Sequence, residues 1–141
     1  MTGQAVVDSC VAVKWVVRED HSDKAVELLQ ADLHLVAPDL VLMEIANALW
    51  KNTKRGLVSA EQAKVRLNDV PGFFNKLLTT PDLVAEAFAL GNTADVPIYD
   101  CIYVVAARRI GTRLVTADAK LISKLAGTPD EARVIHITDW T

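Results

Sequence analysis

The chain has 141 residues, of which 51% are hydrophobic and 23% charged, and its formal net charge is −3. This length fits one domain, which we expect to span residues 1–141, and the apolar content excludes a disordered chain. No apolar run is long enough to cross a membrane. The negative net charge argues against a protein that binds nucleic acid through its overall charge alone. The first residues lack the pattern of a signal peptide, so we expect a cytoplasmic protein.

Short β-branched runs alternate with longer helical patterns, which is typical of an α/β domain. In chain order, the first half predicts a strand at residues 5–8, helices at 9–17 and 22–32, a strand at 34–37, a helix from Pro38 and Asp39 to about Lys54, and a helix at 60–69. The second half predicts a short strand at 73–78, a helix from 81 to about 91, a helix at 98–110, a strand at 113–116, a helix at 119–125 and a strand at 133–137. We therefore expect a central parallel sheet of about four to five strands flanked by helices.

Local signals mark several of these ends. Ser59 is followed three residues later by Gln62, which is a capping-box signature for the helix at 60–69. Gly56 and Gly111 follow predicted helices at the position where glycine commonly ends one. The two cysteines, Cys10 and Cys101, do not make a disulfide framework or a zinc motif, so we expect reduced and mostly buried thiols.

Four of the 18 acidic residues lie in apolar surroundings where a carboxylate is unexpected. Asp8 ends the run AVVD, Glu44 lies inside LVLMEIANAL, Asp100 lies inside PIYDCIYVVAA, and Asp118 follows the strand RLVTAD. Burying a lone carboxylate is costly unless it has a partner, a shifted pKa or a metal. These segments hold no matching Lys or Arg that we expect to be buried; Lys14, six residues after Asp8, is the nearest basic exception.

The predicted elements allow the four acids to meet. Asp8 and Asp118 fall at the carboxyl ends of predicted parallel strands, the edge at which open α/β sheets place ligand sites. Glu44 and Asp100 lie near the starts of helices, and a helix that follows a strand begins at this same edge. Mg²⁺ and Mn²⁺ prefer hard oxygen ligands, and a carboxylate cluster holding them can cleave a phosphodiester bond. The pattern therefore indicates a metal-dependent phosphotransfer or nuclease centre.

Four segments in order resemble the PIN-domain family and, within it, the VapC-type ribonuclease toxins of toxin–antitoxin pairs. These segments are VVDSCVAVKWVV, PDLVLMEIANALWK, IYDCIYVVAARRIG and RLVTADAKL. The family's acids match Asp8, Glu44, Asp100 and Asp118. The resemblance implies that these acids bind Mg²⁺ or Mn²⁺ and support RNA cleavage. Some relatives carry a further acid after the fourth, where this chain has Ala119 and Lys120, so the number of metal ions stays open.

The resemblance also implies a homodimer and an antitoxin whose C-terminal segment covers the site. We expect Asp8, Asp100 and Asp118 to hold the metal, and Glu44 either to complete its shell or to orient the attacking water. Three residues are candidates for support. Ser9 and Thr116 either contact the acids or form ordinary caps and turns. Asn47 lies one helical turn after Glu44. It orients Glu44, contacts the substrate, or is a polar residue beside the cleft without a role.

Two other functions are compatible with parts of the pattern. A catalytically weak PIN-like module could act mainly by binding an antitoxin through an apolar groove. A receiver-like signalling domain would need adjacent acids after the first strand, whereas Asp8 is followed by Ser9 and Cys10.

Overall fold

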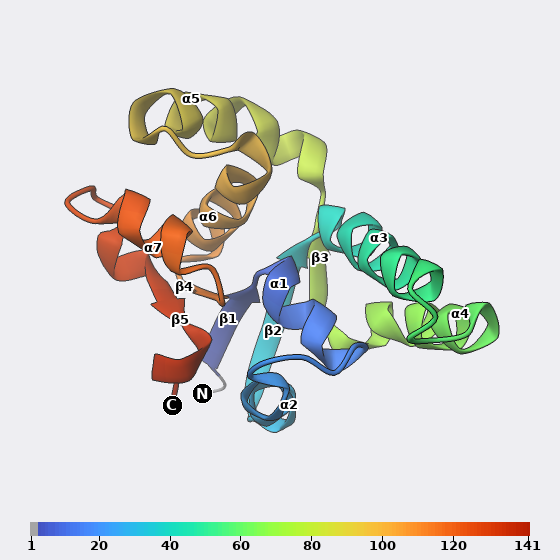
Figure 1. The fold of residues 1–141 in the computed structure, drawn as a ribbon. Coiled ribbons are helices and arrows are strands. Elements are labelled where there is room, and N and C mark those ends of the chain that lie inside the picture. The colour runs from blue at the N-terminus through green and yellow to red at the C-terminus, as the bar shows by residue number, and fades with distance from the viewer. Residues whose placement is uncertain (1–2) are drawn as a thin grey trace.

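The computed structural model describes residues 3–141, and its centre is a parallel β-sheet. The described residues form five strands in the order β3-β2-β1-β4-β5 (Figure 1). The strands are β1 Gly3–Val7, β2 Leu33–Pro38, β3 Lys76–Leu78, β4 Arg113–Thr116 and β5 Val134–His136. The predicted α/β fold with a parallel sheet of about four to five strands is confirmed.

The first strand lies in the middle of the sheet. Val6 of β1 is in register with Val36 of β2 on one side and with Leu114 of β4 on the other. The chain adds β2 and β3 outward from β1 and then returns to add β4 and β5 on the opposite side. The direction in which strands are added therefore reverses between β1 and β4.

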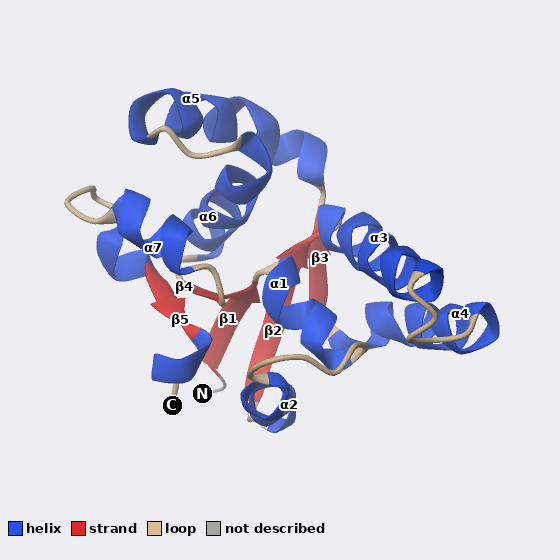
Figure 2. Cartoon of the chain, viewed as in Figure 1, coloured by secondary structure: helices blue, strands red, loops and turns tan. Residues whose placement is uncertain are grey.

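Helices surround this sheet (Figure 2). They are α1 Ser9–Ala12, α2 Ser22–Gln30, α3 Leu40–Lys54, α4 Ala60–Asp69, α5 Val84–Ala94, α6 Ile98–Ile110 and α7 Ala119–Leu125. Ala5, Val6 and Val7 of β1 are all buried. Because consecutive strand residues point to opposite faces, both faces of the sheet are covered, as expected for parallel strands.

Helix α6 is the most deeply buried helix of the described fold. It packs against β1, β2 and β4, and its residues from Cys101 to Ala107 are all buried. It ends at Gly111, whose φ of 68° is the left-handed conformation that glycine adopts readily at a helix end. The run of apolar residues on every side of this helix explains its central place.

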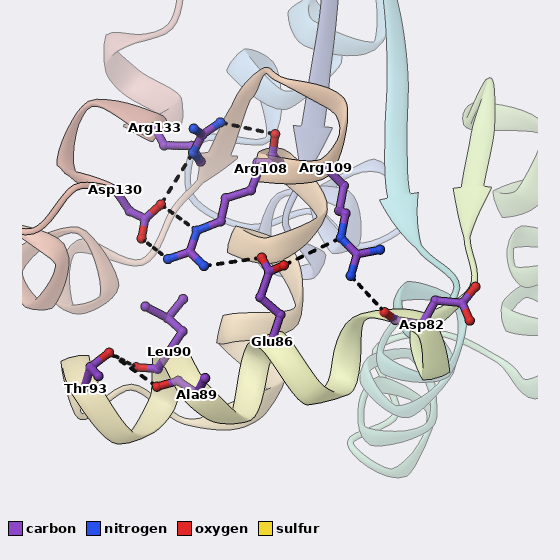
Figure 3. Close-up of polar contacts among 10 residues, drawn as sticks. Asp82, Glu86, Ala89, Leu90, Thr93, Arg108, Arg109, Asp130 and Arg133 are labelled. Carbon is purple, nitrogen blue, oxygen red and sulfur yellow. Dashed lines mark hydrogen bonds and ion pairs between the residues drawn. The ribbon is translucent and has the colours of Figure 1, made fainter.

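A cluster of charged side chains fixes the carboxyl end of α6 (Figure 3). Arg108 forms two hydrogen bonds to the carboxylate of Asp130, and its Nη1 lies 3.3 Å from Oε2 of Glu86 on α5. Arg133 lies 3.5 Å from Asp130, and Arg109 lies 3.7 Å from Glu86. Asp130 is buried, and its carboxylate accepts hydrogen bonds from Arg108. The arginine pair lowers the pKa of Asp130.

The predicted helix over residues 9–17 is wrong in length. α1 ends at Ala12 and passes into a 3-10 turn at Val13–Trp15. The Trp15 indole donates a 2.8 Å hydrogen bond to the carbonyl of Ala25, and its ring packs against Phe73 and Phe74. The segment is rich in β-branched valine, which weakens helix propensity, and the contacts of Trp15 come from distant segments that a local pattern does not show.

Two further boundaries differ from the predictions. Pro38 was expected to open a helix, but it is the last residue of β2 and pairs with Leu78, so α3 begins at Leu40. The helix predicted over 81–91 begins as a 3-10 turn at Thr80–Leu83, and α5 then continues past Gly91. A Cβ atom at Gly91 would lie 2.6 Å from Cδ1 of Ile98, so this glycine serves close packing against α6 and does not end the helix.

The other elements begin and end within three residues of their predicted positions. Four match at both ends, namely Ala60–Asp69, Ile98–Ile110, Arg113–Thr116 and Ala119–Leu125. Within residues 3–141, each helix is too short or too polar to span a bilayer.

Candidate active site

Asp8 and Asp118 lie at the carboxyl ends of the two adjacent strands between which the sheet order reverses. Asp8 directly follows β1, and its N–H donates a 3.0 Å hydrogen bond to the carbonyl of Val115 in β4. Asp118 lies two residues beyond the end of β4. In open α/β sheets, the crevice outside the carboxyl ends at such a reversal is the usual position of a ligand site.

A buried threonine connects these two acids. The hydroxyl of Thr116 donates a 2.7 Å hydrogen bond to Oδ2 of Asp8, and the Thr116 hydroxyl oxygen accepts a 3.0 Å hydrogen bond from the N–H of Asp118. Thr116 and Asp8 are 0% and 4% exposed, so neither bond competes with water. The Cys10 thiol lies 3.4 Å from the same hydroxyl. Both cysteines are free thiols, as expected; Cys101 is buried and Cys10 is half-buried.

Burial raises the pKa of Asp8 from its ordinary value of 3.8 to about 6. Removing a carboxylate from water disfavours its charged form. The hydrogen bonds from Thr116 and Cys10 oppose this shift, whereas the negative charges of Asp100 and Glu44 add to it. The same cause acts on the Cys10 thiol, whose pKa rises to about 12, so this cysteine is a neutral thiol at physiological pH.

Glu44 reaches the site from α3 and is held by a tyrosine of α6. The hydroxyl of Tyr103 donates a 2.6 Å hydrogen bond to Oε1 of Glu44. Burial and then the charge of Glu44 raise the pKa of Tyr103 far above its ordinary value, while the nearby hydroxyl of Ser9 lowers it. Tyr103 was not among the residues singled out from the sequence, because an aromatic residue in an apolar helix reads as core. Asn47 is exposed, and among residues 3–141 no hydrogen bond joins it to Glu44.

Asp100 lies half-buried in the first turn of α6. Its pKa is raised by burial first, and then by the negative charges of Asp118 and Glu44. Lys124 of α7 opposes this shift, and its ammonium group donates a 2.7 Å hydrogen bond to the carbonyl of Asp95. The cation that acts on this acid therefore comes from outside the four apolar segments. Lys14, the basic residue nearest to Asp8 in sequence, pairs instead with Glu19 at 3.1 Å.

Asp118 also has a local structural role. Its Oδ1 accepts hydrogen bonds from the N–H groups of Lys120 and Leu121, at 3.0 and 3.2 Å, and so caps the first turn of α7. The cap fixes the position of this carboxylate relative to the end of β4. It occupies only one of the two carboxylate oxygens.

The four acids act on one another electrostatically, although no three acidic, histidine or cysteine side chains of the described residues already stand in a metal-ligating arrangement. Three of the carboxylates use one oxygen for a protein hydrogen bond, as Asp8 does to Thr116, Glu44 to Tyr103 and Asp118 to the start of α7. In the described part of the chain, no hydrogen bond engages the second oxygen of Glu44 or of Asp118. This hard, anionic set of oxygen donors fits Mg²⁺ or Mn²⁺.

A comparison with known protein families finds a match over most of the chain. Residues 5–127 match the family model described as the PIN domain, a span that includes all four acids. The chain belongs to the PIN domain family. The resemblance inferred from the four sequence segments is thereby confirmed.

Relatives among characterised proteins carry ribonuclease names. Ribonuclease VapC3 from Pyrobaculum aerophilum is 34% identical over 121 residues, which cover 84% of this chain and 92% of that protein. Ribonuclease VapC1 from Mycobacterium tuberculosis is 26% identical over 134 residues, which cover 94% and 98%.

Solved structures share the fold. PAE2754 from Pyrobaculum aerophilum superposes with a TM-score of 0.72 at 26% identity, covering 98% of this chain and 92% of that one. VapBC2 from Rickettsia felis, bound to a DNA fragment from its promoter, has a TM-score of 0.66 at 14% identity, covering 98% and 99%. A toxin–antitoxin complex from Klebsiella pneumoniae has a TM-score of 0.61 at 16% identity, covering 94% and 97%. At such low identity, the last two show the fold alone.

Proposed function

We propose that the chain is a metal-dependent endoribonuclease that acts in the cytoplasm as the toxin of a VapBC-type toxin–antitoxin pair. The proposal is supported above all by the positions of Asp8 and Asp118 beyond the ends of β1 and β4, and by the negative charges of Asp100 and Glu44, which raise the pKa of Asp8. The charges of Asp118 and Glu44 likewise raise the pKa of Asp100. Family membership and the ribonuclease names of relatives support the same reading.

In this proposal Asp8, Asp100 and Asp118 hold the metal ion. When bound, Mg²⁺ or Mn²⁺ would offset the charge of the RNA phosphate and make a water molecule more acidic. The chain's own residues orient the donors. Thr116 fixes Asp8, the α7 cap fixes Asp118, and Glu44 either completes the ligand set or accepts the proton of the attacking water.

We further propose an antitoxin partner and a homodimer. Four large apolar side chains on or next to α3 and α4 are exposed, namely Met43, Trp50, Leu57 and Val65. Met43 and Trp50 are seven residues apart and so lie on the same face of α3. Exposed apolar side chains that gather on neighbouring elements are typical of protein-binding surfaces. Size-exclusion chromatography with light scattering that finds only monomer at high concentration would contradict the dimer.

The direct test is cleavage of a mixed RNA pool by purified protein in Mg²⁺, in Mn²⁺ and in EDTA, beside an Asp100→Asn variant. The matched control is Asp32→Asn, which changes an exposed aspartate. We expect metal-dependent cleavage that Asp100→Asn abolishes and Asp32→Asn retains. Folded, antitoxin-free protein that cleaves nothing and does not bind Mn²⁺ in calorimetry would refute the nuclease and favour a module that acts by binding its antitoxin.

A further inference from the structure

The hydrogen bond between Tyr103 and Glu44 joins two helices across the candidate site. Tyr103 lies one helical turn after Asp100 on α6, and Glu44 lies in the second turn of α3. The phenol is 1% exposed, and its oxygen is 2.6 Å from Oε1 of Glu44. The bond is therefore short and charge-assisted, and its phenol end is buried, which are conditions that make such a bond strong.

This bond restricts a side chain that is otherwise free to move. A glutamate has three side-chain torsions, and Glu44 is only half-buried. Met43, which is 69% exposed, and Asn47, which is also exposed, extend into solvent, so they do not restrict the Glu44 side chain. Among the described residues, the Tyr103 hydroxyl is the hydrogen-bond donor to this carboxylate.

The bond also leaves part of the carboxylate available. Tyr103 engages Oε1, and in residues 3–141 no hydrogen bond engages Oε2. The negative charge of Glu44 raises the pKa of both Asp8 and Asp100, so this carboxylate lies near both acids. A donor that holds one oxygen in place presents the other at a defined position, which is what catalytic geometry requires.

We propose that Tyr103 is a positioning residue of the acidic site, whose hydroxyl fixes the Glu44 carboxylate so that its free oxygen serves the cation or the attacking water. This inference rests on the proposed ribonuclease function. It assigns to the buried phenol of α6 the orienting role that the sequence had suggested for Asn47.

The test is a double-mutant cycle with Tyr103→Phe, Glu44→Gln and the two together. Tyr103→Phe removes only the hydroxyl and keeps the ring in the core. Tyr99→Phe is the matched control, because Tyr99 lies on the same helix and is 67% exposed. We expect Tyr103→Phe to lower kcat about tenfold with little change in KM, and Tyr99→Phe to change neither, since misplacement of a reacting group acts on the chemical step.

The decisive comparison is between the two backgrounds. If the hydroxyl acts through Glu44, Tyr103→Phe in a Glu44→Gln protein lowers the residual rate by less than about twofold, since the two effects are not additive. An equal loss in both backgrounds would show a merely structural role for the hydroxyl and overturn the inference. An unchanged kcat in Tyr103→Phe would overturn it as well.

Binding of Mn²⁺ measured by calorimetry gives a readout that does not depend on cleavage. We expect Tyr103→Phe to weaken Mn²⁺ binding several-fold in the wild-type background and not in Glu44→Gln. Wild-type protein that neither cleaves RNA nor binds Mn²⁺ refutes the proposed function and this inference with it. Where wild-type protein binds Mn²⁺ without cleaving the RNA pool, the coupling seen in metal affinity decides the role of Tyr103. Active wild-type protein with no coupling in either readout refutes the positioning role alone.

Discussion

Thr116 and Asp8 are 108 positions apart in the chain, yet the threonine hydroxyl donates a 2.7 Å hydrogen bond to the aspartate carboxylate at the point where β1 and β4 end. The same hydroxyl accepts a hydrogen bond from the N–H of Asp118. One buried side chain thus fixes two of the four acids relative to each other. Its loss leaves a buried carboxylate and a backbone N–H without that partner.

Replacement of Thr116 by valine therefore acts on both stability and activity. We expect Thr116→Val to lower the free energy of unfolding by about 1–3 kcal/mol, because it leaves buried polar groups unsatisfied. We expect RNA cleavage to fall as well, while Thr116→Ser retains the hydroxyl and most of both properties. Urea denaturation and a cleavage assay measure the two effects. A valine variant as stable and active as the serine variant would contradict the role of this hydrogen bond.

Asp8 gives the protein an unusual dependence of stability on pH in the absence of metal. Because its pKa is raised from 3.8 to about 6, the fold favours the protonated carboxyl. Stability that depends on this group is therefore present at low pH and lost as pH rises from about 4 to about 6. Asp8→Asn removes the charge. At pH 7.5 in EDTA we therefore expect its free energy of unfolding to exceed that of wild type by on the order of 2 kcal/mol, with a higher melting temperature.

The difference between the two proteins is the quantity to follow. Thermal melts at pH 4, 5, 6 and 7.5 should show the advantage of Asp8→Asn growing with pH, while the variant cleaves no RNA. A stability difference between the two proteins that is the same at pH 4 and pH 7.5, or absent at both, would show that the ionised Asp8 carboxylate does not destabilise the fold as its burial implies.

The contribution of Asp130 to stability depends on pH in the opposite direction. Its pKa is lowered by the hydrogen bonds from Arg108, so its stabilising contribution is present above the unfolded value and is lost as pH falls below it. Asp130→Asn leaves Arg108 with Glu86 as its remaining acidic partner, and we expect a loss of stability on the order of 2 kcal/mol at pH 7, allowing for the partial exposure of the arginine. The exposed Asp139 is the matched control. The penalty of Asp130→Asn should shrink at pH 3; a penalty that persists there would point to packing and not to charge.

Gly91 tests the close approach of α5 to the start of α6. A Cβ atom there would meet Ile98 Cδ1 at 2.6 Å and the Val96 carbonyl at 3.0 Å, whereas one at Gly72 would meet no atom within 4 Å. We expect Gly91→Ala to destabilise the fold by about 1–3 kcal/mol, because inserting an atom into a packed contact forces a shift, and Gly72→Ala to change it little. Equal melting temperatures for the two variants would contradict the tight contact.

Elements with their own local signals could be predicted from the sequence. The helix Ala60–Asp69 begins at a capping box in which Ser59 and Gln62 bond reciprocally, and α6 ends at a left-handed glycine. Elements that depend on distant contacts could not. The turn at Trp15 is stabilised by Phe73 and Phe74, and the place of Gly91 inside α5 reflects its neighbour Ile98.

The same division holds for the site. The four acids stood out because a carboxylate in an apolar segment violates the usual pattern of burial. The expectation that they lie at one sheet edge follows from the parallel arrangement of the strands. The reversal of strand order between β1 and β4 could be seen only in the structure. Tyr103 could not be identified, since only its hydroxyl is functional in our proposal and its ring fits the apolar helix. Asp130 resembled an ordinary turn residue because its arginine partner lies 22 positions away in the chain.

The central position of β1 links the site to synthesis of the chain. A ribosome that has made residues 1–112 has produced Asp8, Glu44 and Asp100, but neither β4 nor Asp118. At that stage β1 has no partner along one edge, because β4 pairs there. Non-local pairings of this kind form late, since the chain between them must first be ordered. The acidic site therefore assembles only once nearly the whole domain has been translated, and a nascent chain interrupted before β4 carries the acids without the site.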